Sequence, residues 1–108
     1  METAARTPPD PAGSPFPHLF APIHLGPALA PNRIMRVATT ANLAERNRVG
    51  KRMLAFYATV ARGGAGTIVS EAVRVHPMDA VTPGAIALFD RKSVRSLRKI
   101  SNAIHDAG

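Results

Sequence analysis

The sequence contains no cysteine and no tryptophan, and its 108 residues include only one tyrosine and four phenylalanines. Without cysteine, these residues form no disulfide, no thiolate metal site and no cysteine nucleophile. Ligands for an iron–sulfur cluster would have to come from polypeptide outside them. The four histidines are not spaced as metal ligands, since no pair lies four residues apart on an expected helix. We therefore expect no metal site.

Long apolar runs are also missing. No run approaches the roughly 18 residues that a membrane-spanning helix requires. The N-terminus, METAARTPPDPAGSP, lacks the apolar centre of a secretory signal. These two absences predict a cytoplasmic protein with no membrane partner. The hydrophobic fraction of 45% would suffice for the modest core of one small domain.

Proline is unevenly distributed, with eight of its ten residues within residues 1–31. Residues 1–15 combine Pro, Ala, Gly, Ser and Thr with almost no large apolar side chain, a composition typical of a disordered tail. The single domain would then span residues 16–108. Its first part, up to Asn32, carries apolar residues on both sides of Gly26-Pro27, which predicts a short hairpin.

Apolar patterning predicts two buried strands with a helix between them. The strands are expected at residues 33–40 and 65–73, where β-branched residues gather. The intervening stretch, GKRMLAFYATVARGG, ends in Gly63-Gly64, which is a helix C-cap signal. One face of this helix would be apolar, with Met53, Phe56, Tyr57 and Val60 spaced at three and four residues.

The last segment, DRKSVRSLRKISNAIHDAG, predicts a second helix that begins after Asp90, a favourable N-cap residue, with Gly108 as its C′ residue. Its apolar stripe would consist of Val94, Leu97, Ile100 or Ser101, and Ile104. The opposite face would be basic, with Arg91, Lys92, Arg95, Arg98 and Lys99.

The order of strand, helix, strand, long loop and helix is the repeating unit of a parallel α/β sheet with right-handed crossovers. A closed barrel of such units needs roughly 250 residues. Two strands alone would leave apolar faces and edges uncovered. We therefore expect an α/β fold that is an incomplete piece of a larger one.

The charge is strongly basic: residues 32–108 contain thirteen Lys and Arg against five Asp and Glu, a net +8, whereas residues 1–31 carry −1. A basic surface suits nucleic acid, so a small nucleic-acid-binding module is an alternative reading. No aromatic residue lies within the basic run of the last helix, and no helix-turn-helix or RNA-binding signature appears. We expect a solvated basic face and no specific nucleic-acid partner.

Three colinear stretches carry a resemblance to a known family: LFAPIHLG with NRIMRVATTANLAE, then FYATVARGGAGTIVSEAV, then PGAIALFDRKSVRSLRKISNAIHDAG. They resemble the start of the Old Yellow Enzyme family of NADH:flavin oxidoreductases, and most closely the subgroup with trimethylamine dehydrogenase and 2,4-dienoyl-CoA reductase. The resemblance covers residues 16–108. It implies the N-terminal portion of an FMN-binding (β/α)8 TIM barrel, namely a hairpin and the first two β/α units.

The resemblance also implies which residues contact the flavin of FMN. In the family, the end of the first barrel strand packs against the flavin, a role that would fall on Val37, Ala38, Thr39 and Thr40. Thr40 stands where the family often places a hydroxyl or thiol near the carbonyl edge of the ring. The residue after the glutamate of the second strand also approaches the flavin, and here it is Ala72. Small side chains at Ala38 and Ala72 would let the ring lie flat over the barrel mouth.

By the same resemblance, the intact protein would be an FMN-dependent oxidoreductase, an ene-reductase or a 2,4-dienoyl-CoA reductase-like enzyme. NADH or NADPH would deliver hydride to the flavin, and the substrate would be a small molecule, either an activated alkene or an enoyl thioester. The family's substrate-binding pair and flavin-phosphate site would follow Gly108, so we expect no catalytic residue in this chain. A non-functional truncated remnant is the remaining alternative.

One departure from the family concerns the first strand. Arg36 stands where the family usually has methionine, and a buried arginine without a partner is strongly destabilising. We expect it to pair with Glu71 on the neighbouring strand.

Overall fold

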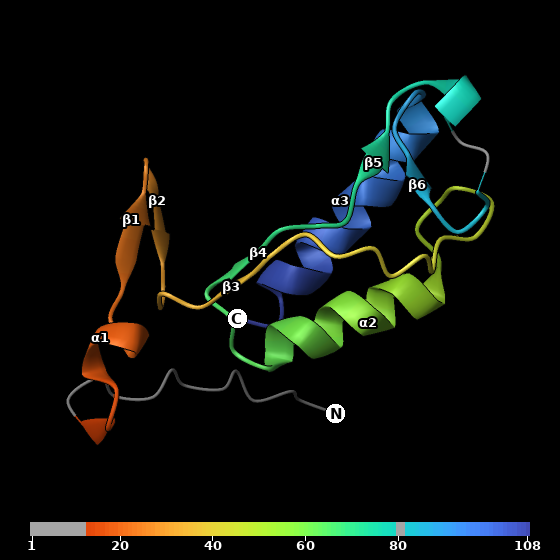
Figure 1. Cartoon of the computed structure of the whole chain (residues 1–108). Coiled ribbons are helices and arrows are strands. Elements are labelled where there is room, and N and C mark those ends of the chain that lie inside the picture. Colours follow the sequence, from red (N-terminus) through yellow and green to blue (C-terminus); the bar gives the residue numbers. More distant parts are fainter. Residues whose placement is uncertain (1–12, 80–81) are drawn as a thin grey trace.

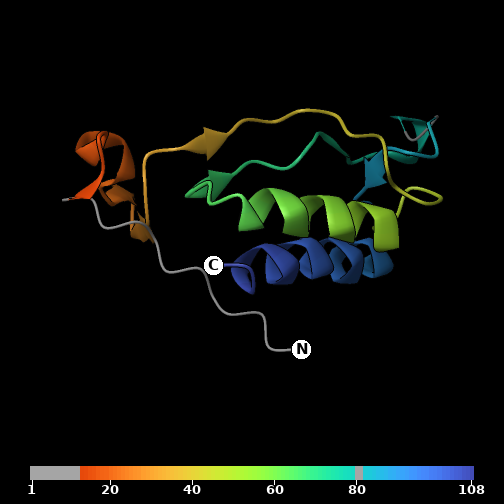
Figure 2. The same cartoon turned by 90° about the horizontal axis from the view of Figure 1, so that it is seen from below.

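The computed structural model describes residues 13–79 and 82–108. In this part of the chain, two helices lie on one side of a layer of short strands, and a small hairpin lies at one end (Figure 1 and Figure 2). Most of the tail predicted at residues 1–15 falls outside the described residues. The elements in chain order are α1 (Pro17–Phe20), β1 (Ile23–Leu25), β2 (Ala28–Ala30), β3 (Met35–Arg36), α2 (Lys51–Arg62), β4 (Thr67–Ile68), β5 (Val73–Arg74), η2 (Pro77–Asp79), β6 (Ile86–Ala87) and α3 (Arg91–His105).

The predicted hairpin is confirmed. β1 and β2 pair antiparallel, with Ile23 opposite Ala30. Gly26 turns the chain with a φ of 60°, a left-handed value that glycine adopts without steric strain. The Arg33 amide donates to the Leu19 carbonyl at 2.9 Å, which ties the segment before the hairpin to the start of β3. The hairpin therefore lies at the end where β3 and β4 begin (Figure 1).

β3 and β4 pair in parallel, as predicted, but both are much shorter than the strands expected at residues 33–40 and 65–73. A strand inside a parallel sheet is held along both edges, whereas β3 and β4 have only each other among the described residues. The chain beyond β4 leaves this pair. Val73 and Arg74 of β5 pair instead with β6, again in parallel.

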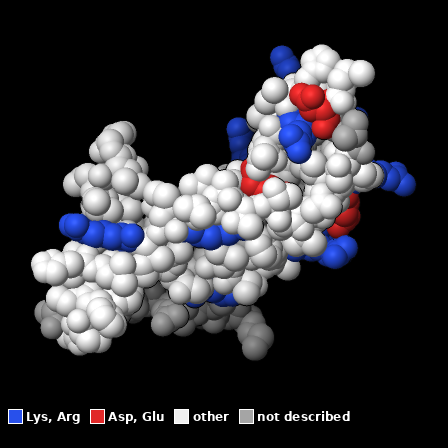
Figure 3. Space-filling view, in the orientation of Figure 1, with Lys and Arg blue, Asp and Glu red and all other residues white. Residues whose placement is uncertain are grey.

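The expectation that both strands are buried is wrong for one of their two faces. Ile68 packs against the core on the helix side. The alternate side chains, Met35, Val37 and Val69, point to the other side and are 48%, 64% and 41% exposed. We call these three residues the open face. Figure 3 views this side of the molecule, and charged side chains are sparse over most of it.

The core lies between the strands and the two helices. Met53 and Tyr57 of α2 are fully buried, as their spacing predicts, and they pack with Val49, Ile86 and Ile100. This cluster joins α2, α3 and β6. Among the described residues, no helix has both the length and the apolarity needed to cross a bilayer.

The predicted helix after Asp90 is confirmed as α3, but its buried side is rotated from the expected stripe. Val94 is 48% exposed, whereas Ser93 and Ser96 are buried. The Ser96 hydroxyl accepts a hydrogen bond from the Val49 amide at 2.7 Å. Small serines let α3 approach the segment before α2 closely, which turns Val94 outward. The helix ends at His105 with Asp106 as its C-cap, so the C′ residue is Ala107 and the prediction of Gly108 at this position is wrong by one residue.

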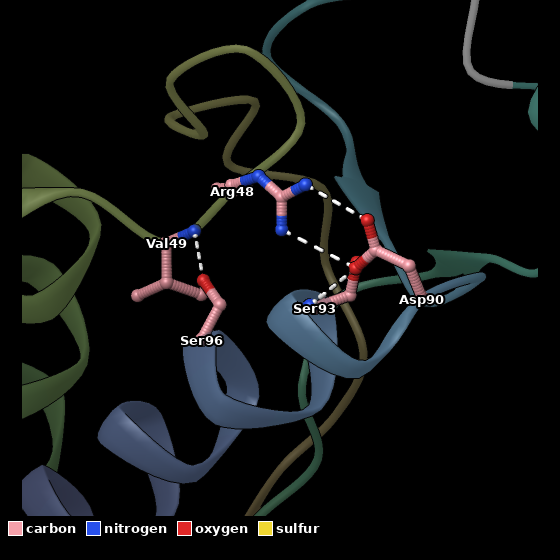
Figure 4. Close-up of polar contacts among 5 residues, drawn as sticks. All are labelled: Arg48, Val49, Asp90, Ser93 and Ser96. Atoms are coloured by element: carbon pink, nitrogen blue, oxygen red, sulfur yellow. Dashed lines mark hydrogen bonds and ion pairs between the residues drawn. The ribbon is translucent and has the colours of Figure 1, made fainter.

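The predicted N-cap of α3 is confirmed and belongs to a larger polar cluster (Figure 4). The Asp90 carboxylate accepts hydrogen bonds from the Ser93 amide and the Ser93 hydroxyl, both at 2.7 Å. Both terminal nitrogens of Arg48 reach the same carboxylate, at 2.9 and 3.3 Å. Hydrogen bonds from the Arg48 guanidinium, and to a smaller extent from Ser93, hold the pKa of the Asp90 carboxyl well below its usual range.

Asn32 fastens the start of β3 to the turn before β4. Its buried side chain donates to the Gly64 carbonyl at 2.8 Å and accepts from the amides of Ile34 and Gly66 at 3.0 and 2.9 Å. A Cβ atom on Gly66 would lie 2.5 Å from the Asn32 carbonyl oxygen. Any residue larger than glycine at position 66 would therefore displace the backbone.

Candidate functional site

The carboxyl ends of β3 and β4 lie at one end of the strand layer, away from the hairpin (Figure 2). Parallel pairing brings the two strand ends together there. Two segments continue from them, residues 37–40 after β3 and residues 69–72 after β4. In parallel α/β barrels, this end of the strands carries the active site.

All five residues predicted to contact a flavin lie in these two segments, and all are exposed: Val37, Ala38, Thr39, Thr40 and Ala72. The Thr39 hydroxyl donates to the Val37 carbonyl at 3.4 Å, a bond within the segment. Among the described residues, the Thr40 hydroxyl has no hydrogen-bond partner. The five residues are therefore accessible to a ligand.

A buried carboxylate links the two segments. Glu71 is only 3% exposed. Its carboxylate accepts hydrogen bonds from the Asn42 amide at 3.3 Å and the Tyr57 hydroxyl at 3.5 Å. The Tyr57 hydroxyl oxygen in turn accepts the Glu71 amide at 2.9 Å. The Glu71 side chain thus joins the segment after β3 to the segment after β4. Tyr57 of α2 hydrogen-bonds to this glutamate and fixes its position.

Apolar spacing alone did not predict this role of Tyr57. The spacing places Tyr57 on the apolar face of α2, which is correct for the ring but leaves the hydroxyl without a partner. A buried tyrosine hydroxyl nearly always makes a hydrogen bond. That requirement is the signal that could have pointed to a polar group at the end of β4.

The predicted pairing of Arg36 with Glu71 is wrong. The Arg36 guanidinium donates to the carbonyls of Val69 and Thr39, at 3.0 and 3.2 Å. Its central carbon lies 5.3 Å from the centre of the Phe56 ring. Carbonyl oxygens and an aromatic face together stabilise a guanidinium without a carboxylate. Arg36 therefore forms a second link between the two segments.

The basic residues of α3 are exposed, as the sequence predicts for a solvated face: Arg91, Lys92, Arg95, Arg98 and Lys99. They belong to the helix layer, whereas the candidate site is built from the strand ends. They contribute nothing to the five-residue cluster described above.

The chain matches the family model described as NADH:flavin oxidoreductase / NADH oxidase over residues 18–108. The chain belongs to this family. The match includes the hairpin, both β/α units and all five residues of the candidate site. It confirms the family that the sequence resembles, and it connects the chain with flavin and nicotinamide chemistry in general terms.

Two curated relatives share 33% identity with the chain over 95 residues each. One is the 4,4'-dithiodibutanoate disulfide reductase of Rhodococcus erythropolis, and the match covers 88% of this chain and 23% of that protein. The other is the NADH oxidase of Thermoanaerobacter brockii, where the match covers 86% of this chain and 15% of the relative. The chain therefore spans less than a quarter of the length of these relatives.

Solved structures of the family superimpose well on the chain. A 2-naphthoyl-CoA reductase in complex with 2-naphthoyl-CoA aligns with a TM-score of 0.78 and 28% identity, over 84% of this chain and 14% of that one. A variant of NCR from Zymomonas mobilis aligns with a TM-score of 0.71 and 35% identity, over 83% and 29%. The old yellow enzyme of Trypanosoma cruzi gives 0.71 and 26%, over 86% and 25%.

These structures establish the fold. They are TIM barrels of which the chain matches a small part, and the described residues form no closed barrel. The elements are those of an N-terminal barrel portion, with a hairpin followed by two β/α units that end in α2 and α3. The predicted fold class, α/β with an incomplete (β/α)8 barrel, is confirmed.

Proposed function

We propose that residues 37–40 and Ala72 form one side of a seat for the flavin ring of FMN, in an oxidoreductase that uses NADH or NADPH. The observation that carries the proposal is the arrangement at the strand ends. Two exposed segments lie at the same end of β3 and β4, and buried or stacked side chains, Glu71 and Arg36, hold them together. Membership of a flavin oxidoreductase family supports it.

The residues present fit a flat aromatic ring. Ala38 and Ala72 are exposed and small, so a planar group can approach the backbone at both positions. The exposed Thr40 hydroxyl can donate a hydrogen bond to a carbonyl at the edge of the ring. Val37, 64% exposed, offers apolar contact area. A bound FMN supplies two-electron chemistry, in which hydride from a reduced nicotinamide is transferred to the substrate.

The role of this chain is to bind and orient rather than to transfer protons. Thr40 donates its hydroxyl, Val37 and the two alanines exclude water from one side of the ring, and Glu71 fixes the spacing between the segments. No residue of the chain is proposed as catalytic. The substrate we propose is a small electron-poor molecule, an activated alkene or an unsaturated acyl thioester, and the similarity to a 2-naphthoyl-CoA reductase favours the thioester.

A chimera tests the flavin seat. Residues 18–108 would replace the matched segment of the Rhodococcus erythropolis disulfide reductase, so that the relative supplies the rest of the barrel. Ala72→Leu should weaken FMN binding by about tenfold, because the larger side chain fills space that the ring needs. Ala55→Leu on the exposed side of α2 is the matched control and should leave FMN binding unchanged.

FMN affinity would be measured by quenching of flavin fluorescence, and turnover would be followed with NADH. Thr40→Val should weaken FMN binding less than Ala72→Leu does, since it removes one hydrogen bond and adds no bulk. Equal FMN affinity in the chimera, Ala72→Leu and Ala55→Leu would show that the seat lies elsewhere. The 108-residue chain alone should purify colourless, and stoichiometric FMN in it would contradict the view that one side of the seat is insufficient.

A further inference from the structure

β5 continues the chain directly from Ala72, at the end of the strand layer that lies away from the hairpin (Figure 1). Side chains alternate in burial along this stretch. Glu71 is buried and Val73 packs against the core, whereas Ala72 and Arg74 are exposed. Successive side chains of an extended chain point to opposite sides. Ala72 and Arg74 therefore point to the same side, away from the core.

The spacing of these two residues places a cation beside the proposed flavin seat. Residues two apart in a strand are separated by roughly 6.6 Å along the chain. Ala72 offers a small side chain where the ring would lie, and the long side chain of Arg74 projects from the next position on the same side. A guanidinium there can contact a group bound at the edge of the ring.

The backbone that carries Arg74 is held in place by β6. Arg74 lies opposite Ala87 in the parallel β5–β6 pair, and its carbonyl accepts the Leu88 amide at 2.8 Å. Ile86 and Ala87 of β6 are both buried, at 0% and 2% exposure. The Arg74 side chain thus projects from a fixed point, which lowers the entropy cost of binding a ligand.

The charge of Arg74 is not neutralised by any carboxylate among the described residues. The one ion pair in this part of the chain joins Arg48 to Asp90. The carboxylate of Glu71 is buried and hydrogen-bonded on the core side. Arg36, the cation that links the two segments, donates to backbone carbonyls. Arg74 is therefore the cation at these strand ends that remains available to a ligand.

We propose that Arg74 is a specificity-determining residue that binds a carboxylate of the substrate beside the flavin. A planar guanidinium can donate two parallel hydrogen bonds to the two oxygens of a carboxylate. One arginine matches the single charge of this group, whereas phosphates are typically bound by several backbone amides or a helix N-terminus. The geometry at Arg74 therefore fits a carboxylate better than a phosphate.

The inference rests on the proposed function, because the position of the ring on Ala72 locates the substrate. It narrows both proposed substrate classes in the same way. The activated alkene or unsaturated acyl thioester would carry a carboxylate close to its electron-poor bond, within reach of Arg74.

Selectivity between a charged and an uncharged substrate tests the proposal. The chimera with the Rhodococcus erythropolis reductase would be assayed with 4,4'-dithiodibutanoate, which has a carboxylate at each end, and with its uncharged dimethyl ester. The ratio of kcat/KM for the dicarboxylate to kcat/KM for the ester should fall about tenfold in Arg74→Gln, because charge-assisted hydrogen bonds are lost. Arg74→Lys keeps the charge and should lose less. Arg95→Gln, an exposed change on α3, should leave the ratio unchanged.

Equilibrium binding gives a second readout that does not require turnover. The dissociation constant of the dicarboxylate for the oxidised chimera, measured by calorimetry, should rise about tenfold in Arg74→Gln and stay unchanged in Arg95→Gln. An unchanged constant or an unchanged ratio in Arg74→Gln would overturn the proposal. So would a rise in the KM for NADH alone, because Arg74 would then bind the reductant. A misplaced flavin seat is recognised separately, by equal FMN affinity in Ala72→Leu and Ala55→Leu.

Discussion

The two sides of the β3–β4 pair differ in how far their apolar side chains are buried. On the helix side, Ile68 packs against a core that contains the fully buried Met53 and Tyr57. On the other side, Met35, Val37 and Val69 are exposed although they are equally apolar. Local sequence supplies the helices that cover one side of the strands, whereas the open face is left exposed by the described residues. The same kind of residue is therefore core on one side and surface on the other.

The largest expected effect comes from introducing an aspartate on each side of the strand pair in turn and comparing the two variants. Met53→Asp places a charge in the core and should cost at least about 4 kcal/mol, because the carboxylate loses its hydration without a partner. Val37→Asp on the open face should keep the helical signal at 222 nm and increase the soluble yield of the chain. Equal loss of helical signal in both variants would show that the open face is also part of the core.

A second effect concerns the hydrogen bonds between Tyr57 of α2 and Glu71 at the end of β4. Tyr57→Phe removes the hydroxyl that accepts the Glu71 amide, and an unsatisfied buried amide costs about 1–3 kcal/mol. Hydrogen exchange of the Glu71 amide should become faster, while exchange within α3 stays unchanged. Thr59→Ala, which removes an exposed hydroxyl of α2 that bonds within the helix and not to Glu71, is the control. If the Glu71 amide exchanged at an unchanged rate in Tyr57→Phe, this hydrogen bond would contribute nothing to the stability of the segment after β4.

Arg36 sharpens the comparison because its side chain links the two strand ends on the helix side, next to Phe56. Arg36→Lys keeps the charge but loses the planar group that reaches two carbonyls and an aromatic ring. We expect a loss of about 0.5–1 kcal/mol, nearly as large as in Arg36→Met. Urea unfolding of the chimera would measure both. A lysine variant as stable as the original would show that charge alone stabilises the site.

The smallest expected effect is the pH dependence of the ion pair between Asp90 and Arg48 at the start of α3. The carboxyl pKa of Asp90 is lowered by Arg48 and Ser93, so its ion pair stabilises the fold above the usual aspartate pKa. That contribution is lost as pH falls through the lowered value. Asp90→Asn should reduce the helical signal slightly at neutral pH, and the difference between the two proteins should shrink in strong acid. A difference that is constant with pH would exclude the ion pair as its cause.

The sequence predicts well what neighbours along the chain determine. Gly26 fixes the hairpin, the spacing of Met53 and Tyr57 fixes the buried side of α2, and Asp90 fixes the start of α3. Each signal acts within a few residues. For this reason these elements are recognisable before any tertiary contact is known.

The predictions that were wrong have a common physical cause, because they depend on contacts between residues that are far apart in the sequence. Val94 is exposed because a serine, Ser96, meets the Val49 amide, and hydrophobicity does not reveal a polar contact between α3 and the segment before α2. The strands are shorter than predicted because the length of a ladder depends on neighbouring strands. The five residues of the candidate site were predicted only from family resemblance. The hydrogen bonds of Glu71 depend on where α2, the segment after β3 and the segment after β4 meet.

Asn32 has a consequence for the order in which the chain folds. Its side chain closes a loop of more than thirty residues, to Gly64 and Gly66, and the intervening residues include all of α2. During synthesis the first β/α/β unit can therefore form once β4 (Thr67–Ile68) has left the ribosome, before α3 has emerged. We expect this unit to be the first native-like structure on the nascent chain, with α3 docking afterwards onto an existing surface.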